Sequence, residues 1–197
     1  RWLHFTHPRQ IITAYTVAEV RPALSAIAAA AQSGLYAAGY LSYEAAGGLD
    51  LAVHPAQSVP PLLWFGLYER VAELSELPPL DAGAPVPTPG WRPAISRATY
   101  LQAIDQIKGQ IARGYTYQVN YTFPLLSDFH GDPFAYFQQL VRAQQVAYAA
   151  YLDLGRWAIC SASPELFFTL DGEKLQSKPM KGTAERGLTF AADEQAR

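Results

Sequence analysis

Residues 167–177 read FFTLDGEKLQS, and this stretch carries a strong local signal for antiparallel β-structure. Two short runs, Phe167–Leu170 and Lys174–Ser177, flank the pair Asp171-Gly172. Asp-Gly between two such runs is a strong signal for a two-residue turn, because glycine readily adopts the positive φ that this turn requires. The stretch therefore predicts an antiparallel β-hairpin.

The sequence outward from this hairpin mixes strand-like and helix-like segments. Apolar and aromatic runs predict strands, and capping residues followed by apolar residues at helical spacing predict helices. The expected strands are 10–15, 36–43, 62–68, 115–126, 147–154 and 156–160, and the expected helices are 21–32, 96–114 and 132–143. Together with the hairpin, these segments predict an α+β fold with antiparallel β-sheets.

Two expectations about the helices depend on single residues or short patterns. Thr16 and Glu19 have capping-box spacing, but Pro22 places the expected start of the first regular helix near Arg21. The second helix has an apolar stripe, which we expect to face a core. The stripe consists of Tyr100, Leu101, Ile104, Ile107 and Ile111.

A proline- and glycine-rich stretch divides the sequence. Residues 78–90 read PPLDAGAPVPTPG, which is too rich in both residues for the interior of a helix or strand. We interpret this stretch as a linker and place a domain boundary near residue 90. Residues 1–90 then form an N-terminal region, and residues 91–197 begin a second domain.

The composition excludes several classes of protein. Half of the 197 residues are hydrophobic and 16% are charged, so an intrinsically disordered chain is excluded. A formal net charge of −2 without a basic run argues against nucleic acid as the main partner. The single Cys160 rules out an internal disulfide, and we expect it to be a small buried hydrophobe. Without a membrane-length apolar stretch, we expect a soluble cytoplasmic protein.

Glu165 and Lys181 are the best candidates for chemistry, sixteen residues apart. A carboxyl group against aromatic surface has a raised pKa and can act as a general acid, and Glu165 precedes Leu166-Phe167-Phe168. Lys181 is followed by Gly182 and Thr183, which suit close approach of a carboxylate ligand. From composition alone, solvent-exposed surface residues are the more frequent alternative for both Glu165 and Lys181.

Other candidate residues give weaker signals. Gln118 and Asn120 lie in an otherwise apolar strand-like run, where they either fix a loop or line a polar pocket. The four histidines are scattered without the spacing of metal ligands. The sequence thus predicts no histidine metal site.

Three short motifs, taken in order, resemble the chorismate-binding enzymes. They are YQVN at 117–120, SASPE at 161–165 and PMKGT at 179–183, and the likeness runs from about Arg97 to the end of the sequence. GYLSYE at 39–44 and PLLWFG at 61–66 are similar to the N-terminal region of the family. The resemblance is strongest to the aminodeoxychorismate synthase branch, which serves 4-aminobenzoate and folate biosynthesis.

The resemblance implies a fold and a role for each candidate residue. The family fold is α+β, with antiparallel sheets packed together and helices outside, and residues 91–197 would be the first part of its chorismate-binding catalytic domain. Lys181 would be the nucleophile that attacks the ring of chorismate, and Glu165 would protonate the departing 4-hydroxyl. Gly182 and Thr183 would hold a substrate carboxylate. Anthranilate synthases carry alanine in place of Lys181, so this residue favours amination at position 4.

The resemblance also implies a cofactor and a partner. The family binds Mg²⁺ through glutamates well downstream of the lysine motif, so we expect those ligands in a segment after Arg197 and expect residues 1–197 alone to be inactive. Ammonia would come from a glutamine amidotransferase subunit or domain. Two alternatives stay open: another chorismate enzyme, such as an anthranilate or isochorismate synthase, or a non-catalytic module that binds a ligand or a partner.

Overall fold

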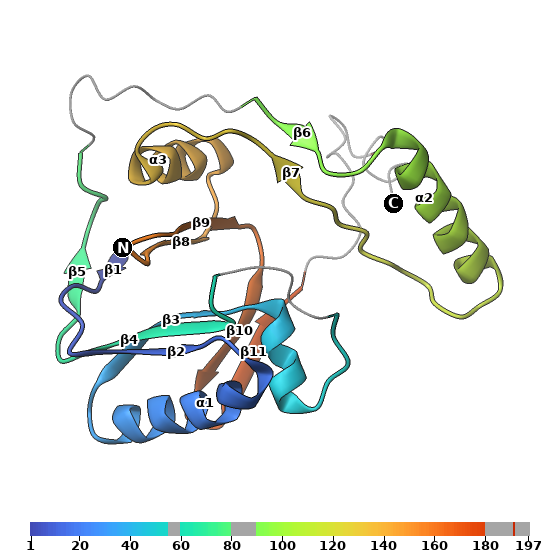
Figure 1. Cartoon of the computed structure of the whole chain (residues 1–197). Coiled ribbons are helices and arrows are strands. Elements are labelled where there is room, and N and C mark those ends of the chain that lie inside the picture. Colours follow the sequence, from blue (N-terminus) through green and yellow to red (C-terminus); the bar gives the residue numbers. More distant parts are fainter. Residues whose placement is uncertain (55–59, 80–89, 180–190, 192–197) are drawn as a thin grey trace. The chain divides into compact units, whose positions relative to one another are not determined.

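A computed structural model describes residues 1–54, 60–79, 90–179 and 191 of the chain (Figure 1). The chain divides into two compact units, residues 1–80 with 146–197 and residues 81–145. Every strand pair among the described residues is antiparallel, and the strands are combined with helices. The predicted α+β class is confirmed. The boundary near residue 90 stays a prediction.

A three-stranded sheet with one helix forms the best-packed part of the first unit. The strands β2 (Gln10–Ala14), β4 (Leu63–Tyr68) and β3 (Tyr36–Leu41) lie in that order, with β4 in the centre. Helix α1 (Val17–Gln32) runs along this sheet in Figure 1. The buried core comprises Ala14, Val20, Ala23, Ile27, Ala45, Leu62 and Leu63. All three strands agree with the predicted ones to within two residues.

Helix α1 begins four residues before the start predicted from Pro22. The Glu19 carboxylate accepts hydrogen bonds from the backbone N–H groups of Tyr15 (2.7 Å) and Thr16 (3.0 Å). These bonds stabilise the first turn and lower the pKa of Glu19. Pro22 lies inside the helix and cannot donate to the carbonyl of Ala18, but Ala18 is exposed and its carbonyl can bond water. The prediction was wrong because the capping box outweighs one missing hydrogen bond.

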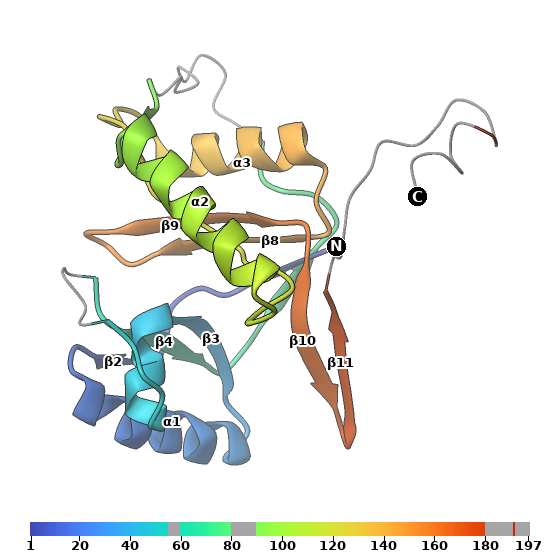
Figure 2. The ribbon, with the colours of Figure 1, turned by 90° about the vertical axis from the view of Figure 1, so that its right-hand side faces the viewer.

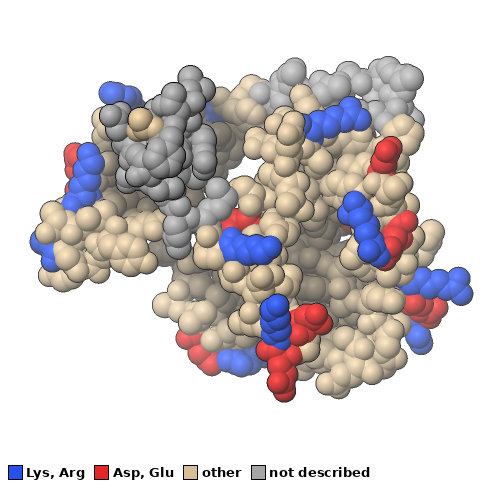
Figure 3. Space-filling view, turned by 180° about the vertical axis from the view of Figure 1, so that it is seen from behind, with Lys and Arg blue, Asp and Glu red and all other residues tan. Residues whose placement is uncertain are grey.

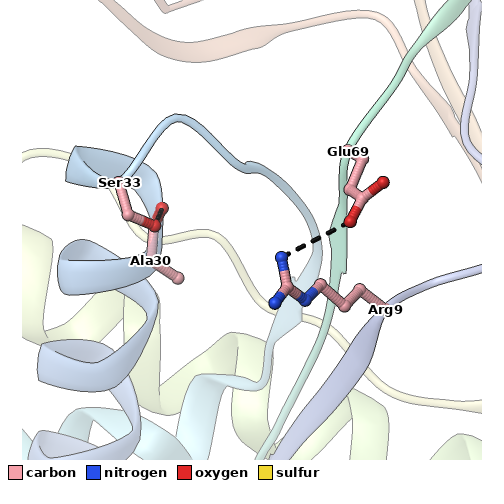
Figure 4. Close-up of polar contacts among 4 residues, drawn as sticks. All are labelled: Arg9, Ala30, Ser33 and Glu69. Atoms are coloured by element: carbon pink, nitrogen blue, oxygen red, sulfur yellow. Dashed lines mark hydrogen bonds and ion pairs between the residues drawn. The ribbon is translucent and has the colours of Figure 1, made fainter.

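The C-terminal end of α1 confirms Gly34 as the residue after the cap. Gly34 has a φ of 94°, and its N–H donates to Ala31, while the N–H of Leu35 donates to Ala30. This pair of bonds is a Schellman motif, which needs a positive φ at the glycine. The Ser33 hydroxyl also donates to the Ala30 carbonyl at 2.7 Å (Figure 4). The short 3₁₀ segment η1 (Tyr43–Leu49) follows β3.

Three two-stranded pairs complete the first unit. β1 (Trp2–His4) pairs with β5 (Ala72–Leu74), and β8 (Tyr148–Asp153) pairs with β9 (Ala158–Ser163). β10 (Leu166–Asp171) pairs with β11 (Lys174–Lys178) in the predicted hairpin, clearly visible in Figure 2.

The turn of this hairpin lies one residue later than the sequence predicts. Asp171 pairs with Lys174, so the two turn residues are Gly172 and Glu173, and Gly172 has a φ of 58°. The predicted strands and their antiparallel pairing are confirmed. Aspartate closes the hairpin while glycine takes the first turn position, where a positive φ is required.

The second unit contains two helices and one short strand pair. β6 (Arg92–Pro93) pairs with β7 (Leu125–Leu126), and α2 (Arg97–Ala112) and α3 (Pro133–Gln144) are the helices. Both predicted caps are confirmed: Ser96 Oγ accepts from Thr99 N–H, and the Asp132 carboxylate accepts from two N–H groups at the start of α3.

Two predictions about the second unit were wrong. The predicted strand over 115–126 is reduced to Leu125–Leu126, because the preceding residues have no strand partner among the described residues. The rings of Tyr121 and Phe123 instead pack on Tyr100 of α2, with centroids 5.9 and 5.8 Å away. No residue of α2 is buried, so its apolar stripe does not face a core in this structure.

Cys160 is less buried than the sequence predicts. Cys160 lies in β9 opposite Tyr151 and is half-buried, whereas the sequence led us to expect full burial. Over the part of the chain that the structure describes, no helix is long and apolar enough to cross a membrane.

Candidate active site

Glu165 lies on the tight connection between β9 and β10, in the first unit (Figure 2). The Ser163 hydroxyl fixes this connection: Ser163 Oγ accepts from the Glu165 N–H at 3.2 Å and donates to the Glu165 carbonyl at 2.9 Å. Pro164 restricts the φ of the residue between them. The Ser-Pro-Glu sequence therefore builds a rigid turn that holds the backbone of the glutamate at the start of a strand.

A β-bulge follows Glu165 directly. Leu166 pairs with Lys178 and Thr169 pairs with Gln176, so between these two pairs β10 contains one residue more than β11. The extra residue brings the rings of Phe167 and Phe168 to a centroid distance of 5.2 Å. Bulges bend a strand and re-aim its side chains, and they are frequent beside active sites.

The described residues leave Glu165 exposed to solvent. Phe167 and Phe168, which were expected to shield it, are themselves 85% and 53% exposed. The desolvation that the sequence predicted for the Glu165 carboxyl is therefore not supplied by these neighbours. A general acid at this position requires further chain or a bound substrate to exclude water.

The hairpin brings the end of β11 beside the start of β10, next to Glu165. Leu166, the residue after Glu165, pairs with Lys178 at the end of β11. Lys178 is three residues before Lys181 in the sequence. Lys181, Gly182 and Thr183 lie outside the described residues, so the structure does not report their geometry.

Gln118 and Asn120 belong to the second unit. Both are exposed and lie outside any strand, and the Gln118 carbonyl accepts a hydrogen bond from the Thr116 hydroxyl at 3.0 Å. This bond fixes a local turn, which favours the loop interpretation of the two we left open.

A magnesium site does not form from the residues that the structure describes. Among residues 1–54, 60–79, 90–179 and 191, no three histidine, cysteine, aspartate or glutamate side chains gather to hold a metal ion. The described residues thus do not fit Mg²⁺ on their own. The expected ligands after Arg197 stay a proposal.

Sequence reasoning missed a surface hollow of about 570 Å³ in the first unit. It is formed by the connection from β1 to β2 and the connection from β4 to β5, and it contains none of the predicted site residues. Arg9 and Glu69 form an ion pair across it at 3.4 Å (Figure 4). The hollow was missed because strand pairing, and not sequence proximity, brings its residues together.

Charge is scattered over the face seen in Figure 3. Basic and acidic side chains occur singly or in mixed groups on it, and most of the visible surface carries no charge. The described residues on this face form no continuous basic surface of the kind that binds nucleic acid.

The sequence matches one protein family over nearly its whole length. Residues 3–197 match the family described as chorismate binding enzyme. An aminodeoxychorismate synthase from Streptomyces griseus is 40% identical over 98 residues, which cover 49% of this chain and 14% of that protein. An anthranilate synthase component 1 from Thermus thermophilus is 36% identical over 99 residues, covering 50% of this chain and 21% of the relative.

The fold is also similar to that of one solved structure. The crystal structure of anthranilate synthase component I from Streptococcus pneumoniae TIGR4 gives a TM-score of 0.70 at 14% sequence identity. The match covers 87% of this chain and 52% of that chain. The chain thus spans about half the length of this structural relative, and its alignments with the curated relatives cover a smaller share of theirs.

Proposed function

This chain belongs to the family of chorismate binding enzymes, and we propose that its protein converts chorismate and ammonia to 4-amino-4-deoxychorismate. The observation that carries the proposal is the Ser163–Glu165 turn and the hairpin that follows it. The turn holds Glu165 at the start of β10, and β11 brings the chain back to Lys178, three residues before Lys181. A sixteen-residue spacing between an acid and an amine suits this topology.

The first chemical step assigns one role to each residue. The Lys181 Nζ forms a bond to a ring carbon of chorismate, the ring electrons shift, and the bond from C4 to the hydroxyl oxygen breaks. Glu165 gives its proton to that oxygen, which leaves as water. A free lysine has a pKa of about 10.4, so Lys181 needs burial or a nearby cation to be neutral at pH 7.

The second step releases the enzyme. The nitrogen of ammonia forms a bond to C4, the ring electrons return, and the bond between Nζ and the ring breaks. The Glu165 carboxylate takes back one proton from the incoming nitrogen. Two successive displacements allow the amine to occupy the face that the hydroxyl left.

The remaining components of the reaction are proposed at the level of the family. Gly182 and Thr183 would bind a carboxylate of chorismate through backbone N–H groups and the hydroxyl. Mg²⁺, held by ligands beyond Arg197, would offset the charge of a ring carboxylate. A glutamine amidotransferase would supply ammonia, and relatives named component 1, such as that of Klebsiella aerogenes, are consistent with a second component.

The decisive experiment replaces the nucleophile. In the complete gene product, assayed with chorismate, ammonia and Mg²⁺, we expect Lys181→Ala to lower the rate of 4-amination by about 10³-fold or more. Lys174→Ala, which changes an exposed lysine at the tip of the hairpin, is the matched control and should keep its activity. A Lys181→Ala variant with the wild-type rate would refute the nucleophile assignment.

Glu165 is tested separately from Lys181. Glu165→Gln removes the proton donor but keeps the size and the backbone turn, so we expect a rate loss of about 10²–10⁴-fold. Ser163→Ala is a useful companion, since it removes only the hydrogen bonds that hold the turn. A smaller loss for Ser163→Ala than for Glu165→Gln supports a chemical role for the carboxyl group.

Anthranilate formation is the second candidate function. The Thermus thermophilus relative, 36% identical over half of this chain, bears that name. The presence of Lys181, where the anthranilate branch carries alanine, favours the 4-amino product. Chromatography of the products of the complete protein decides between the two, since 2-amination would yield anthranilate.

A further inference from the structure

The hollow in the first unit gathers polar side chains that the proposed reaction does not use. It lies between the connection from β1 to β2 and the connection from β4 to β5, and its volume is about 570 Å³. No described residue of the candidate active site lines it. Its polar lining residues are His4, Thr6, His7, Arg9, Glu69 and Arg70.

Strand pairing holds the two connections that form the hollow. At one end β1 is paired with β5, and at the other end β2 is paired with β4. The N–H of Arg9 adds a hydrogen bond to the carbonyl of Leu67 at 2.8 Å. The ring of Phe5 packs against the buried ring of Tyr68, with centroids 5.2 Å apart. Both walls therefore have a fixed backbone, so a ligand loses little affinity to ordering of the site.

Hydrogen-bond donors and positive charge predominate among the polar side chains of the hollow. Arg9 and Arg70 carry one positive charge each, and Glu69 carries one negative charge, which leaves a net charge of +1 with the histidines neutral. His4 and His7 each have an N–H donor in either protonation state. The arrangement therefore suits an anion whose oxygen atoms accept several hydrogen bonds.

The donors of the hollow are available to a ligand. The side chains of His4, His7 and Arg70 have no hydrogen bond or ion pair within the described part of the chain. Arg9 contacts the Glu69 carboxylate at 3.4 Å, and the two side chains are 66% and 65% exposed (Figure 4). Such a long, exposed ion pair contributes little to stability, so an anion can replace the carboxylate beside Arg9.

We propose that this hollow binds a small phosphate monoester, whose phosphate oxygens accept hydrogen bonds from the guanidinium groups of Arg9 and Arg70. A guanidinium forms paired hydrogen bonds to phosphate, and imidazole N–H groups donate to the remaining oxygens. The volume is within the range of about 300–1,000 Å³ that is typical of small-molecule sites. It exceeds what a phosphate group alone fills, so the organic part of the ligand lies beside Val71 and Ala72.

A small ligand fits this site better than a nucleic acid does. A nucleic acid strand is bound along a row of basic side chains, and this hollow has two arginines. The site is also separate from the proposed reaction, because chorismate carries carboxylates and no phosphate. The inference therefore adds a second ligand and does not depend on which amine is formed.

The test measures binding of phenyl phosphate to the complete protein by isothermal titration calorimetry, at low salt so that charge interactions are weakly screened. We expect saturable binding with a Kd below about 1 mM. Phenyl sulfate has the same ring but one negative charge less, and it should bind at least about 5-fold more weakly. Amide exchange in 4–9 and 69–72 should slow when phenyl phosphate is added.

Three variants locate the site. Arg70→Gln removes a charged donor and should weaken binding by about 10-fold. Glu69→Gln removes the negative charge and releases Arg9, so it should strengthen binding by about 3-fold, a gain that a damaged fold does not produce. Arg21→Gln is the matched control: it removes the same charge from an exposed arginine of α1 that pairs with Asp50, and it should change binding by less than about 2-fold.

Four results would overturn the proposal. The first is the absence of saturable binding of phenyl phosphate. The second is an equal loss for Arg70→Gln and Arg21→Gln, which would mean that net charge alone attracts the probe. The third is weaker binding by Glu69→Gln. The fourth is equal or tighter binding of phenyl sulfate or of phthalate, a dicarboxylate, which would exclude selection of phosphate. No chorismate is added and no turnover is measured, so failure of the proposed reaction does not affect these results.

Discussion

The sheet of β2, β4 and β3 and the hairpin of β10 and β11 are both antiparallel, yet only the sheet has a core. Leu63, in the central strand β4, is fully buried under α1, whereas Leu175 in β11 is 67% exposed. Both strands were predicted from the sequence. Strand pairing in a hairpin therefore follows from the local sequence pattern, whereas the stability of a sheet depends on a second layer packed against it.

The largest expected effect separates the two leucines. Leu63→Ala removes a fully buried side chain and should lower the free energy of unfolding by about 2–5 kcal/mol. Leu175→Ala removes an exposed side chain and should change it by less than about 0.5 kcal/mol in residues 1–197. Urea denaturation followed by circular dichroism measures both. Equal losses would mean that the hairpin has a core of its own.

Gly39 in β3 tests how closely the sheet is packed. A Cβ at this position would lie 2.6 Å from the Cα of Phe65 on β4, and the backbone has no room to accept it without shifting. Gly39→Ala should therefore destabilise the first unit by about 1–3 kcal/mol. Gly90→Ala is the control, because nothing lies within 4 Å of its added Cβ. A neutral Gly39→Ala would show that the sheet can separate locally.

A substitution at Gly172 tests how much the hairpin turn contributes to stability. Its φ of 58° is unfavourable for alanine by about 1 kcal/mol, so Gly172→Ala should destabilise the turn locally. Amide exchange in 166–178 should become about 5-fold faster, while the unfolding midpoint of the β2–β4–β3 sheet stays constant. A shift of that midpoint would indicate that the hairpin and the sheet unfold together.

Glu19 gives the smallest effect and one that depends on pH. Hydrogen bonds from the backbone of Tyr15 and Thr16 lower the pKa of Glu19 in the folded state from its ordinary value of 4.5. Its stabilising contribution is thus complete above the unfolded-state pKa and is lost as the pH falls through the lower folded-state pKa. Glu19→Gln should lower the thermal midpoint slightly at pH 7, and the difference should vanish in acid.

Local signals were the part of the fold that could be predicted from the sequence. Ser96, Asp132, Gly34 and the Asp-Gly pair act on backbone groups within four residues, so their effects do not depend on the rest of the chain. Non-local features were mispredicted. The segment 115–126 has a strand-like composition, but over most of its length it has no partner strand within the described part of the chain.

The candidate site shows the same difference between local features, which the sequence predicted, and non-local ones, which it did not. Glu165 and its turn were identified from three adjacent residues, and the Ser163 hydrogen bonds explain that success. The expected aromatic shielding of Glu165 depends on which layer covers Phe167 and Phe168, and the described residues leave both rings exposed. The hollow near Arg9 depends on pairing between distant strands, so no sequence pattern predicted it.

Local sequence patterns were sufficient to predict the α+β class, the antiparallel hairpin, the helix caps and the chorismate-binding family. Backbone preferences and short motifs act over a few residues, which is why sequence is sufficient for them. Which apolar residues are buried depends on tertiary packing: most of β4 is buried, whereas no residue of α2 is fully buried and β10 is exposed from Phe167 to Asp171. Burial is a property of surfaces brought together from distant parts of a chain, and a single segment does not encode its partner.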